Sequence, residues 1–409
     1  EKILRIAKEE NADIIGLSGL ITPSLDEMVY VAKEMKRQVF ETPLLIGGAT
    51  TSSKHTAIKI APEYENTTVR VKDASRVSHI VGDLLNPDKK IEFDGKIKKE
   101  QENQRIAFDA KPKNDLVDYE EAYRNRLTLD WENEDIAVPS FIGLKQITDY
   151  PLEEIRKYID WTFFFSAWEM RGSYPKILND PVRGKAAREL FDNANNLLDR
   201  IINKKLLQAN VAYGFWPANS EKDDIILYED EKITGELVRF NMLRQQKIRN
   251  GITLSLSDFI APKNSGINDY IGAFAITTGI NAEELAKKYE TENDDYNAIM
   301  IKTLADRLAE AFAELMHQRV RKEWGFPDGK DITNQDLIKE KYRGIRPAFG
   351  YPACPNHEEK IKLFKILDSE KIGMRLTENF SMIPAASVSG LYFSSKKAKY
   401  FAIGKIDIP

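Results

Sequence analysis

The sequence predicts two kinds of fold in one chain: a parallel α/β segment over residues 1–86 and an α+β domain over residues 111–409. In the first segment, short uncharged runs alternate with amphipathic helical patterns, which is typical of a parallel sheet with helices between its strands. In the second, strand-like runs cluster ahead of one long helical pattern. Between them, residues 87–110 are dominated by charge and predict a solvated linker or an exposed helix.

The α/β segment contains three expected strands, at 13–18, 43–47 and 68–71, and helices that end near Asn11, span 24–38 and begin near Ser53. Small residues follow each strand, at 18–22, 47–51 and 72–75. Ligands of open α/β sheets bind outside the carboxyl ends of the strands, so these turns are expected to line one crevice. A nucleotide phosphate is one candidate, although the chain has neither a Gly-x-Gly-x-x-Gly motif nor a P-loop.

Apolar runs that alternate with turns predict the α+β domain. Strands are expected at 213–218, 225–228, 237–240 and 270–277, with a last pair around 391–394 and 400–403. Apolar residues at three- and four-residue spacing predict a helix over 294–324, and a shorter helix is expected over 358–370.

Residues 343–357 have the composition of a ligand-binding loop. Prolines and glycines fix its backbone, Arg346 can grip a carboxylate, and Tyr351 offers a ring to a cation. The alternative is a proline-rich surface connection with a buried thiol, Cys354.

Three carboxylates are further candidates. Asp160 lies among six aromatic residues between 158 and 168, and such a cluster is usually core. A carboxylate there must be paired, hydrated or available to a ligand. Asp306 and Glu310 share one face of the long helix, where carboxylates are usually solvated.

Composition excludes several classes of function. The net charge of −4, with 42% apolar and 30% charged residues, argues against a nucleic-acid partner. One cysteine and four scattered histidines predict no disulfide and no metal site. No apolar run approaches the roughly 20 residues of a membrane span. We therefore expect a cytoplasmic monomer, and the start inside a helical pattern suggests a fragment of a longer protein.

The loop sequence resembles the signature of the activation domain of cobalamin-dependent methionine synthase. The resemblance rests on Arg-Pro-Ala-Phe-Gly-Tyr-Pro-Ala-Cys-Pro at 346–355 with His357 and Lys360, and on runs at 270–275, 294–297, 304–314 and 386–394. The first segment is similar to the second half of the family's corrinoid module through 18–20 and 47–48. The family's Asp-x-His-x-x-Gly motif is absent, and His79, preceded by Val77, only imitates it. The resemblance thus implies a truncated flavodoxin-like module and an activation domain with a bent antiparallel sheet and helices.

Carried over by position, the resemblance implies two sets of binding residues and no catalytic or metal-binding residue. Residues expected around S-adenosylmethionine are Asp160, Glu310, Arg346, Ala348, Tyr351, Tyr400 and Phe401. Residues expected at cobalamin are Ser18, Thr22, Gly47, Gly48 and Ala74. Phe401 stands where the family often has tyrosine, which removes a hydroxyl. His357 and Asp306 are candidates for a conformational switch, and histidine suits that role because its charge changes near neutral pH.

The implied function is reactivation of methionine synthase. S-adenosylmethionine would methylate cobalamin after one-electron reduction of cob(II)alamin, with flavodoxin or a flavoprotein reductase as electron donor. Other modules of the same enzyme, including zinc-containing ones, would be partners. One alternative is a module that binds S-adenosylmethionine and docks partners without turnover. A self-contained methyltransferase is the weaker alternative, because the expected glycine-rich first turn is missing.

Overall fold

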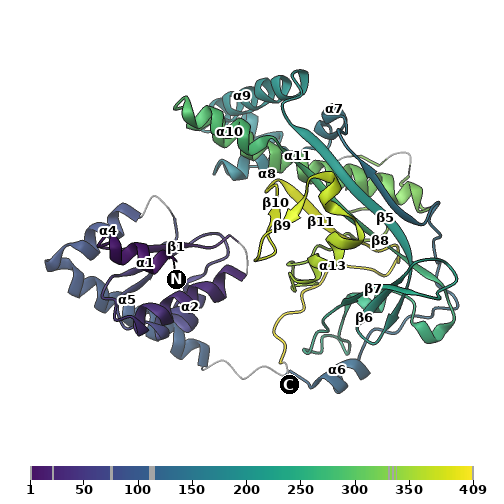
Figure 1. The fold of residues 1–409 in the computed structure, drawn as a ribbon, viewed down its shortest axis with the longest axis horizontal. Coiled ribbons are helices and arrows are strands. Elements are labelled where there is room, and N and C mark those ends of the chain that lie inside the picture. The colour runs from purple at the N-terminus through teal and green to yellow at the C-terminus, as the bar shows by residue number, and fades with distance from the viewer. Residues whose placement is uncertain are drawn as a thin grey trace. The chain divides into compact units, whose positions relative to one another are not determined.

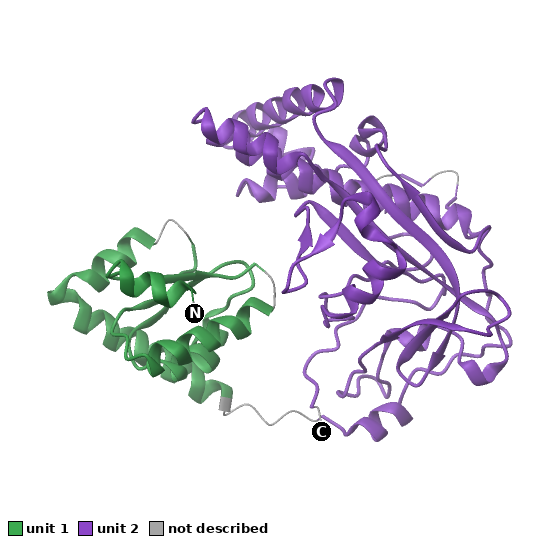
Figure 2. Cartoon of the chain, viewed as in Figure 1, with its two compact units in different colours: residues 1–115 green, residues 116–409 purple. Residues whose placement is uncertain are grey.

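The computed structural model describes residues 2–20, 23–73, 77–109, 116–329, 332–333, 336–337 and 339–407. The chain forms two compact units, unit 1 over residues 1–115 and unit 2 over residues 116–409 (Figure 2). No helix among the described residues is both long and apolar enough to cross a membrane.

Unit 1 is built on a parallel sheet of three strands, β1 (Ile15–Ser18), β2 (Leu44–Gly47) and β3 (Thr68–Arg70), in the order β1-β2-β3. These strands lie within two residues of the expected ones. Its helices are α1 (Lys2–Glu9), α2 (Pro23–Arg37), α3 (Ser53–His55), which runs on through a π turn at Thr56–Ile60, and α4 (Val77–Leu85). The parallel α/β prediction for this segment is confirmed.

Both faces of this sheet are covered, because side chains alternate along a strand. Leu44 and Ile46 of β2 pack with Leu4 and Met28 of the helices on one face. Leu45 of the same strand packs in a second cluster on the other face. Burial on both faces explains why the strands carry so little charge.

The charged stretch after α4 is a largely exposed helix, α5 (Pro87–Asp109), which agrees with the exposed-helix alternative for residues 87–110 and not with the solvated linker. Phe93 and Ile97 pack against the second apolar cluster of unit 1. Gln101 Nε2 donates to the carbonyl oxygen of Thr68 at 2.7 Å, and Arg105 Nη1 donates to that of Ala57 at 3.0 Å. The boundary between the units lies after residue 115, so unit 1 includes α5.

Unit 2 is built on an antiparallel sheet whose longest strands are β5 (Gln208–Glu221) and β8 (Asp269–Ile280). The order is β11-β8-β5-β6-β7 (Figure 1). Strand β4 also pairs with β5. Residues 211–215 of β5 pair with β4, and residues 218–221 pair with β6 along the same edge. The remaining strands are β4 (Gly143–Ile147), β6 (Asp224–Tyr228), β7 (Glu236–Asn241) and β11 (Ser387–Tyr392), with a separate pair of β9 (Arg375–Leu376) and β10 (Met382–Ile383).

The long helix α11 (Asp295–Glu323) covers one face of this sheet, where Leu304 and Phe312 pack with Phe274 of β8. Alternate residues of β8, such as Ala273, face a second cluster that contains Leu363. The other helices are α6 (Tyr119–Arg124), α7 (Leu152–Arg156), α8 (Trp161–Ala167), α9 (Gly184–Asn203), α10 (Ala282–Thr291) and α13 (Glu359–Ile366). The α+β prediction is confirmed for this unit.

The expected strand pair at the carboxyl end was wrong. Residues 391–394 only overlap the end of β11, which pairs antiparallel with β8. Residues 400–403 form no strand. They are fixed instead by single contacts, because Tyr400 Oη accepts from the Arg346 N–H at 3.0 Å and the Ile403 N–H donates to the Pro352 carbonyl oxygen at 2.8 Å.

Candidate functional site

A pocket of about 540 Å³ opens in unit 2 beside α11, and we call it the α11 pocket. Its volume is in the range of small-molecule sites. The start of α8, the middle of α11 and the loop from Arg346 to Tyr351 supply most of its wall. The lining residues are Tyr158, Asp160, Phe163, Arg307, Glu310, Ala311, Glu314, Leu337, Glu340, Arg346 and Tyr351. The structure thus brings together four predicted residues that lie far apart in the sequence.

Asp160 is placed by the helix that follows it. Its Oδ1 atom caps α8 by accepting the Thr162 N–H at 2.8 Å, which satisfies one free N–H of the first turn. The aromatic residues after it are largely core, as the usual interpretation of such a cluster holds, with Phe164 and Phe165 fully buried. Phe163 is the exception, because 59% of it is exposed and it lines the pocket.

Arg346 forms the cationic end of the pocket. Its Nη2 atom lies 2.7 Å from Glu314 Oε2 of α11, and both side chains are largely buried. Burial raises the pKa of Glu314, and the charge of Arg346 counteracts that shift. Arg346 Nε and Glu314 Oε1 are buried and have no hydrogen-bond partner among the described residues. The pair therefore retains unused hydrogen-bonding capacity at the edge of the pocket.

In the loop that carries Arg346, position 350 requires glycine. This glycine has a φ of +98°, and an added Cβ would lie 2.3 Å from the His357 ring. Its N–H donates to the Cys354 carbonyl oxygen at 2.8 Å. Cys354 Sγ contacts the Ala348 carbonyl oxygen, and burial raises the pKa of this thiol to about 12. Cys354 is thus a packed side chain and not a nucleophile.

The other residues predicted at this site do not line the pocket. Ala348 belongs to the same loop, and Tyr400 holds the backbone of Arg346. Phe401 packs against Phe259, at 6.3 Å between ring centroids, in the second core cluster.

The two switch candidates also lie outside the pocket lining. His357 lies under Gly350, and its Nδ1 atom is 2.9 Å from Lys360 Nζ. Burial, and then the charge of Lys360, lowers the pKa of His357 to about 4. Asp306 is exposed on α11, one turn before Glu310.

Sequence reasoning missed several lining residues, above all Glu314 and Arg307. Glu314 lies between Ala313 and Leu315 in a helix that is buried nearly all round at this level, so its apolar neighbours concealed it. The available signal was its position four residues after Glu310, which places both carboxylates on one face.

The residues predicted at cobalamin lie in unit 1. Ser18 is exposed at the end of β1, and Gly47 ends β2. Gly48 has a φ of +102°, and an added Cβ would lie 2.1 Å from the Gly19 carbonyl oxygen, so only glycine fits there. Thr22 and Ala74 lie outside the described residues.

His79 belongs to the surface of α4, where it lies 3.6 Å from Asp83. Across the described ranges, no group of three or more histidine, cysteine, aspartate and glutamate residues is placed to hold a metal ion.

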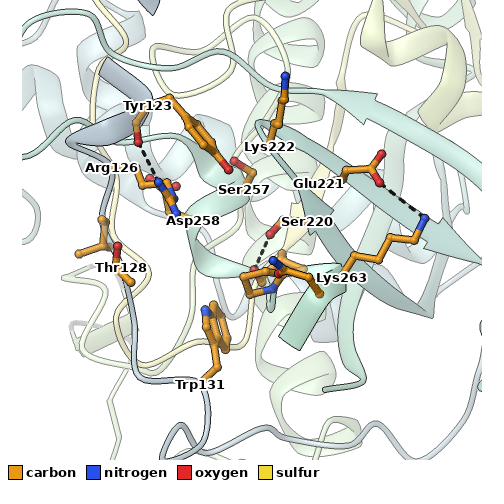
Figure 3. Close-up of a pocket in the computed structure, with 14 residues that line it drawn as sticks. Tyr123, Arg126, Thr128, Trp131, Ser220, Glu221, Lys222, Ser257, Asp258 and Lys263 are labelled. Atoms are coloured by element: carbon orange, nitrogen blue, oxygen red, sulfur yellow. Dashed lines mark hydrogen bonds and ion pairs between the residues drawn. The ribbon is translucent and has the colours of Figure 1, made fainter. Parts of the chain in front are cut away.

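A second hollow, of about 370 Å³, lies between α6 and the β5–β6 turn (Figure 3). Its polar groups mostly satisfy one another. Glu221 pairs with Lys263 at 3.6 Å, and Ser220 Oγ donates to the Ile260 carbonyl oxygen at 2.9 Å. No residue predicted from the sequence lines it, so the α11 pocket is the better candidate.

Two comparisons with known proteins identify the family of unit 2. Residues 151–408 match the family described as the vitamin B12-dependent methionine synthase, activation domain. A crystal structure of the MetH reactivation domain bound to AdoHcy is 46% identical to this chain, with a TM-score of 0.70. That match covers 72% of this chain and 91% of the other.

Proposed function

Since this chain belongs to the family of the vitamin B12-dependent methionine synthase activation domain, we propose that its α11 pocket binds S-adenosylmethionine and presents the methyl group for reductive methylation of cobalamin. The observation that supports this proposal most directly is that Asp160, Glu310, Arg346 and Tyr351 line the same pocket. The related reactivation domain was crystallised with AdoHcy, the demethylated form of this ligand, which supports the proposal.

The chemistry of the lining matches each part of S-adenosylmethionine. Arg346 can bind the carboxylate through a charge-assisted hydrogen bond. Asp160 and Glu310 can accept from the ammonium and the ribose hydroxyls. The sulfonium is favoured near carboxylates and the ring of Tyr351. Phe163 and Ala311 add apolar wall for the adenine.

The role of these residues is to position the methyl group. A sulfonium is a good leaving group, so transfer requires no general base from the protein. When bound, cobalamin supplies a cobalt centre that accepts the methyl group once it has received one electron. The bond from sulfur to the methyl carbon breaks in that transfer, and S-adenosylhomocysteine remains in the pocket.

We further propose that unit 1 is part of a flavodoxin-like module for cobalamin. Ser18, Gly47 and Gly48 would contact the nucleotide tail at the strand ends, together with Thr22 and Ala74. The electron would come from flavodoxin or a flavoprotein reductase, and other modules of the same enzyme would complete the cycle. Asp306 and His357 are proposed to change partners when the modules rearrange.

The binding step is tested by calorimetry with S-adenosylmethionine. Arg346→Ala is expected to weaken binding by about 1.5–3 kcal/mol, the contribution of a hydrogen bond to a charged group. Arg239→Ala is the matched control, because Arg239 is also ion-paired but lies on β7 away from the pocket. Unchanged affinity in Arg346→Ala would remove Arg346 from the site.

Arg346→Ala leaves Glu314 buried without its partner, which by itself destabilises a fold. The double variant Arg346→Met with Glu314→Gln removes both charges, and it should lose the same affinity while remaining folded. Methyl transfer to added cob(I)alamin then separates turnover from binding. A rate no greater than background would leave the alternative of a binding and docking module.

A further inference from the structure

A polar stripe on α11 continues from the α11 pocket into the core of unit 2. Glu310, Glu314, His317 and Arg321 follow one another at intervals of four, three and four residues, so they share one face of the helix. Glu310 lines the pocket, whereas the exposed fractions of Glu314, His317 and Arg321 are only 9%, 2% and 0%. Polar side chains buried this deeply usually have a function or a full set of partners.

Two tyrosines from other segments close around this stripe. The His317 ring stacks on Tyr392 of β11, with centroids 5.2 Å apart, and meets Tyr342 edge-on at 4.9 Å. The Arg321 guanidinium lies 4.0 Å from the centroid of Tyr342 and is anchored by Asp328 at 2.6 and 2.7 Å. These contacts join His317, Arg321, Tyr342 and Tyr392 into one cluster. The charges of the Arg346–Glu314 pair act on both tyrosines, and we count the pair with the cluster.

Six polar atoms of this cluster are buried and have no hydrogen-bond partner among the residues the structure describes. They are Glu314 Oε1, His317 Nδ1, Arg321 Nη1, Tyr342 Oη, Arg346 Nε and Tyr392 Oη. Each such atom destabilises the fold if it stays unpaired, because its hydrogen bonds to water are lost on folding. The set contains both donors and acceptors, which is the composition that internal water molecules bridge.

The charges of the pair reach both tyrosines. Burial raises the pKa of Tyr342 and of Tyr392. The charge of Glu314 raises the pKa of both hydroxyls further, whereas the charge of Arg346 lowers it. Burial also lowers the pKa of His317, so its ring is neutral and retains one acceptor nitrogen. The groups that act on the pair from α11, β11 and the segment before Arg346 are uncharged hydrogen-bonding groups, apart from Glu310, Arg321 and Glu340.

We propose that His317, Tyr342 and Tyr392 are positioning residues of the α11 pocket: with bridging water molecules they form a hydrogen-bonded layer that fixes the Arg346–Glu314 pair from behind. The inference rests on the proposed function only in its choice of ligand. By holding the guanidinium in one orientation, the layer presents Arg346 to a ligand carboxylate without ordering it anew at each binding event.

The test compares two ligands in the full chain. S-adenosylhomocysteine has a carboxylate, and 5′-methylthioadenosine lacks the amino-acid portion. Tyr392→Phe and Tyr342→Phe should each weaken S-adenosylhomocysteine about 3- to 10-fold, the equivalent of one neutral hydrogen bond. Both variants should bind 5′-methylthioadenosine with an affinity within about 2-fold of that of the unaltered protein, because this ligand has no carboxylate for Arg346 to bind.

Tyr228→Phe is the matched control. Tyr228 is a buried tyrosine of β6 whose hydroxyl also lacks a partner among the described residues, but it does not line the pocket. This variant should leave both affinities unchanged. Equal weakening of both ligands in Tyr392→Phe, or no weakening of either, would show a merely structural role and overturn the inference.

A crystal structure of the unliganded protein gives a readout that does not depend on the ligand. Ordered water within hydrogen-bonding distance of Tyr392 Oη and of Glu314 Oε1 or His317 Nδ1 is expected. A dry cluster would overturn the inference even if S-adenosylhomocysteine binds. If the unaltered protein binds neither ligand but the water is present, the proposed function fails and the hydrated layer stands as a feature of the core.

Discussion

His357 couples the stability of unit 2 to pH. Its pKa falls from about 6.5 in the unfolded chain to about 4 in the folded protein, through burial first and the charge of Lys360 second. Between these values the unfolded chain binds a proton that the folded chain excludes. This contribution to the free energy of unfolding is therefore complete above about pH 6.5 and is lost as the pH falls through 4.

We expect His357→Gln to flatten that dependence. Urea unfolding of the full chain at pH 4, 5, 6 and 7 should show a steeper loss of stability in the unaltered protein than in the variant. His79→Gln, at an exposed position on α4, is the control and should keep the original slope. Identical slopes for His357→Gln and the unaltered protein would mean that His357 takes up its proton equally well in the folded state.

Single residues of the loop could be predicted where their chemistry is local. Arg346 and Tyr351 stand in a segment whose glycines and prolines already mark a fixed backbone, and both line the pocket. Glu314 could not be found in this way, because its function depends on Arg346, 32 positions later in the chain. The packing of the Phe401 ring against the second core cluster could not be predicted either, because no local pattern reveals it.

At the scale of elements, α5 shows why a charged segment is hard to interpret. Its charged residues face solvent over most of its surface, and a narrow apolar contact through Phe93 and Ile97, with the hydrogen bonds of Gln101 and Arg105, docks it to unit 1. Composition predicts the solvated surface but not the docking. The strands of unit 1 were predictable because burial on both faces leaves short apolar runs that end abruptly at small residues.

Gly95 tests whether α5 is a helix in solution. It lies in the middle of this helix, and an added Cβ would meet nothing within 4 Å. Gly95→Ala should therefore stabilise unit 1 by about 0.5–1 kcal/mol through helix propensity and a less flexible unfolded chain. Denaturant unfolding followed by circular dichroism measures this change.

Gly82→Ala provides the comparison, because Gly82 lies in α4 and an added Cβ there also meets nothing. Both substitutions should stabilise unit 1 to a similar extent. If Gly82→Ala stabilises unit 1 and Gly95→Ala does not, residues 87–109 form a solvated linker in solution and not a docked helix.

At the scale of the whole molecule, the two units have separate cores. The apolar clusters of unit 1 draw only on its own helices and sheet, and those of unit 2 only on residues after 116. Every residue that lines the α11 pocket belongs to unit 2, as do all members of the buried stripe. A domain with its own core is expected to fold alone.

Residues 116–409 expressed without unit 1 should therefore fold and bind S-adenosylmethionine with a Kd within about 2-fold of the full chain, because the pocket loses no lining residue. Calorimetry measures the affinity, and thermal unfolding of both proteins checks that the shorter one has a cooperative transition. Removal of unit 1 should at the same time abolish any binding of cobalamin, since Ser18, Gly47 and Gly48 go with it. A folded unit 2 that binds S-adenosylmethionine more than 10-fold more weakly would show that unit 1 contributes to the pocket.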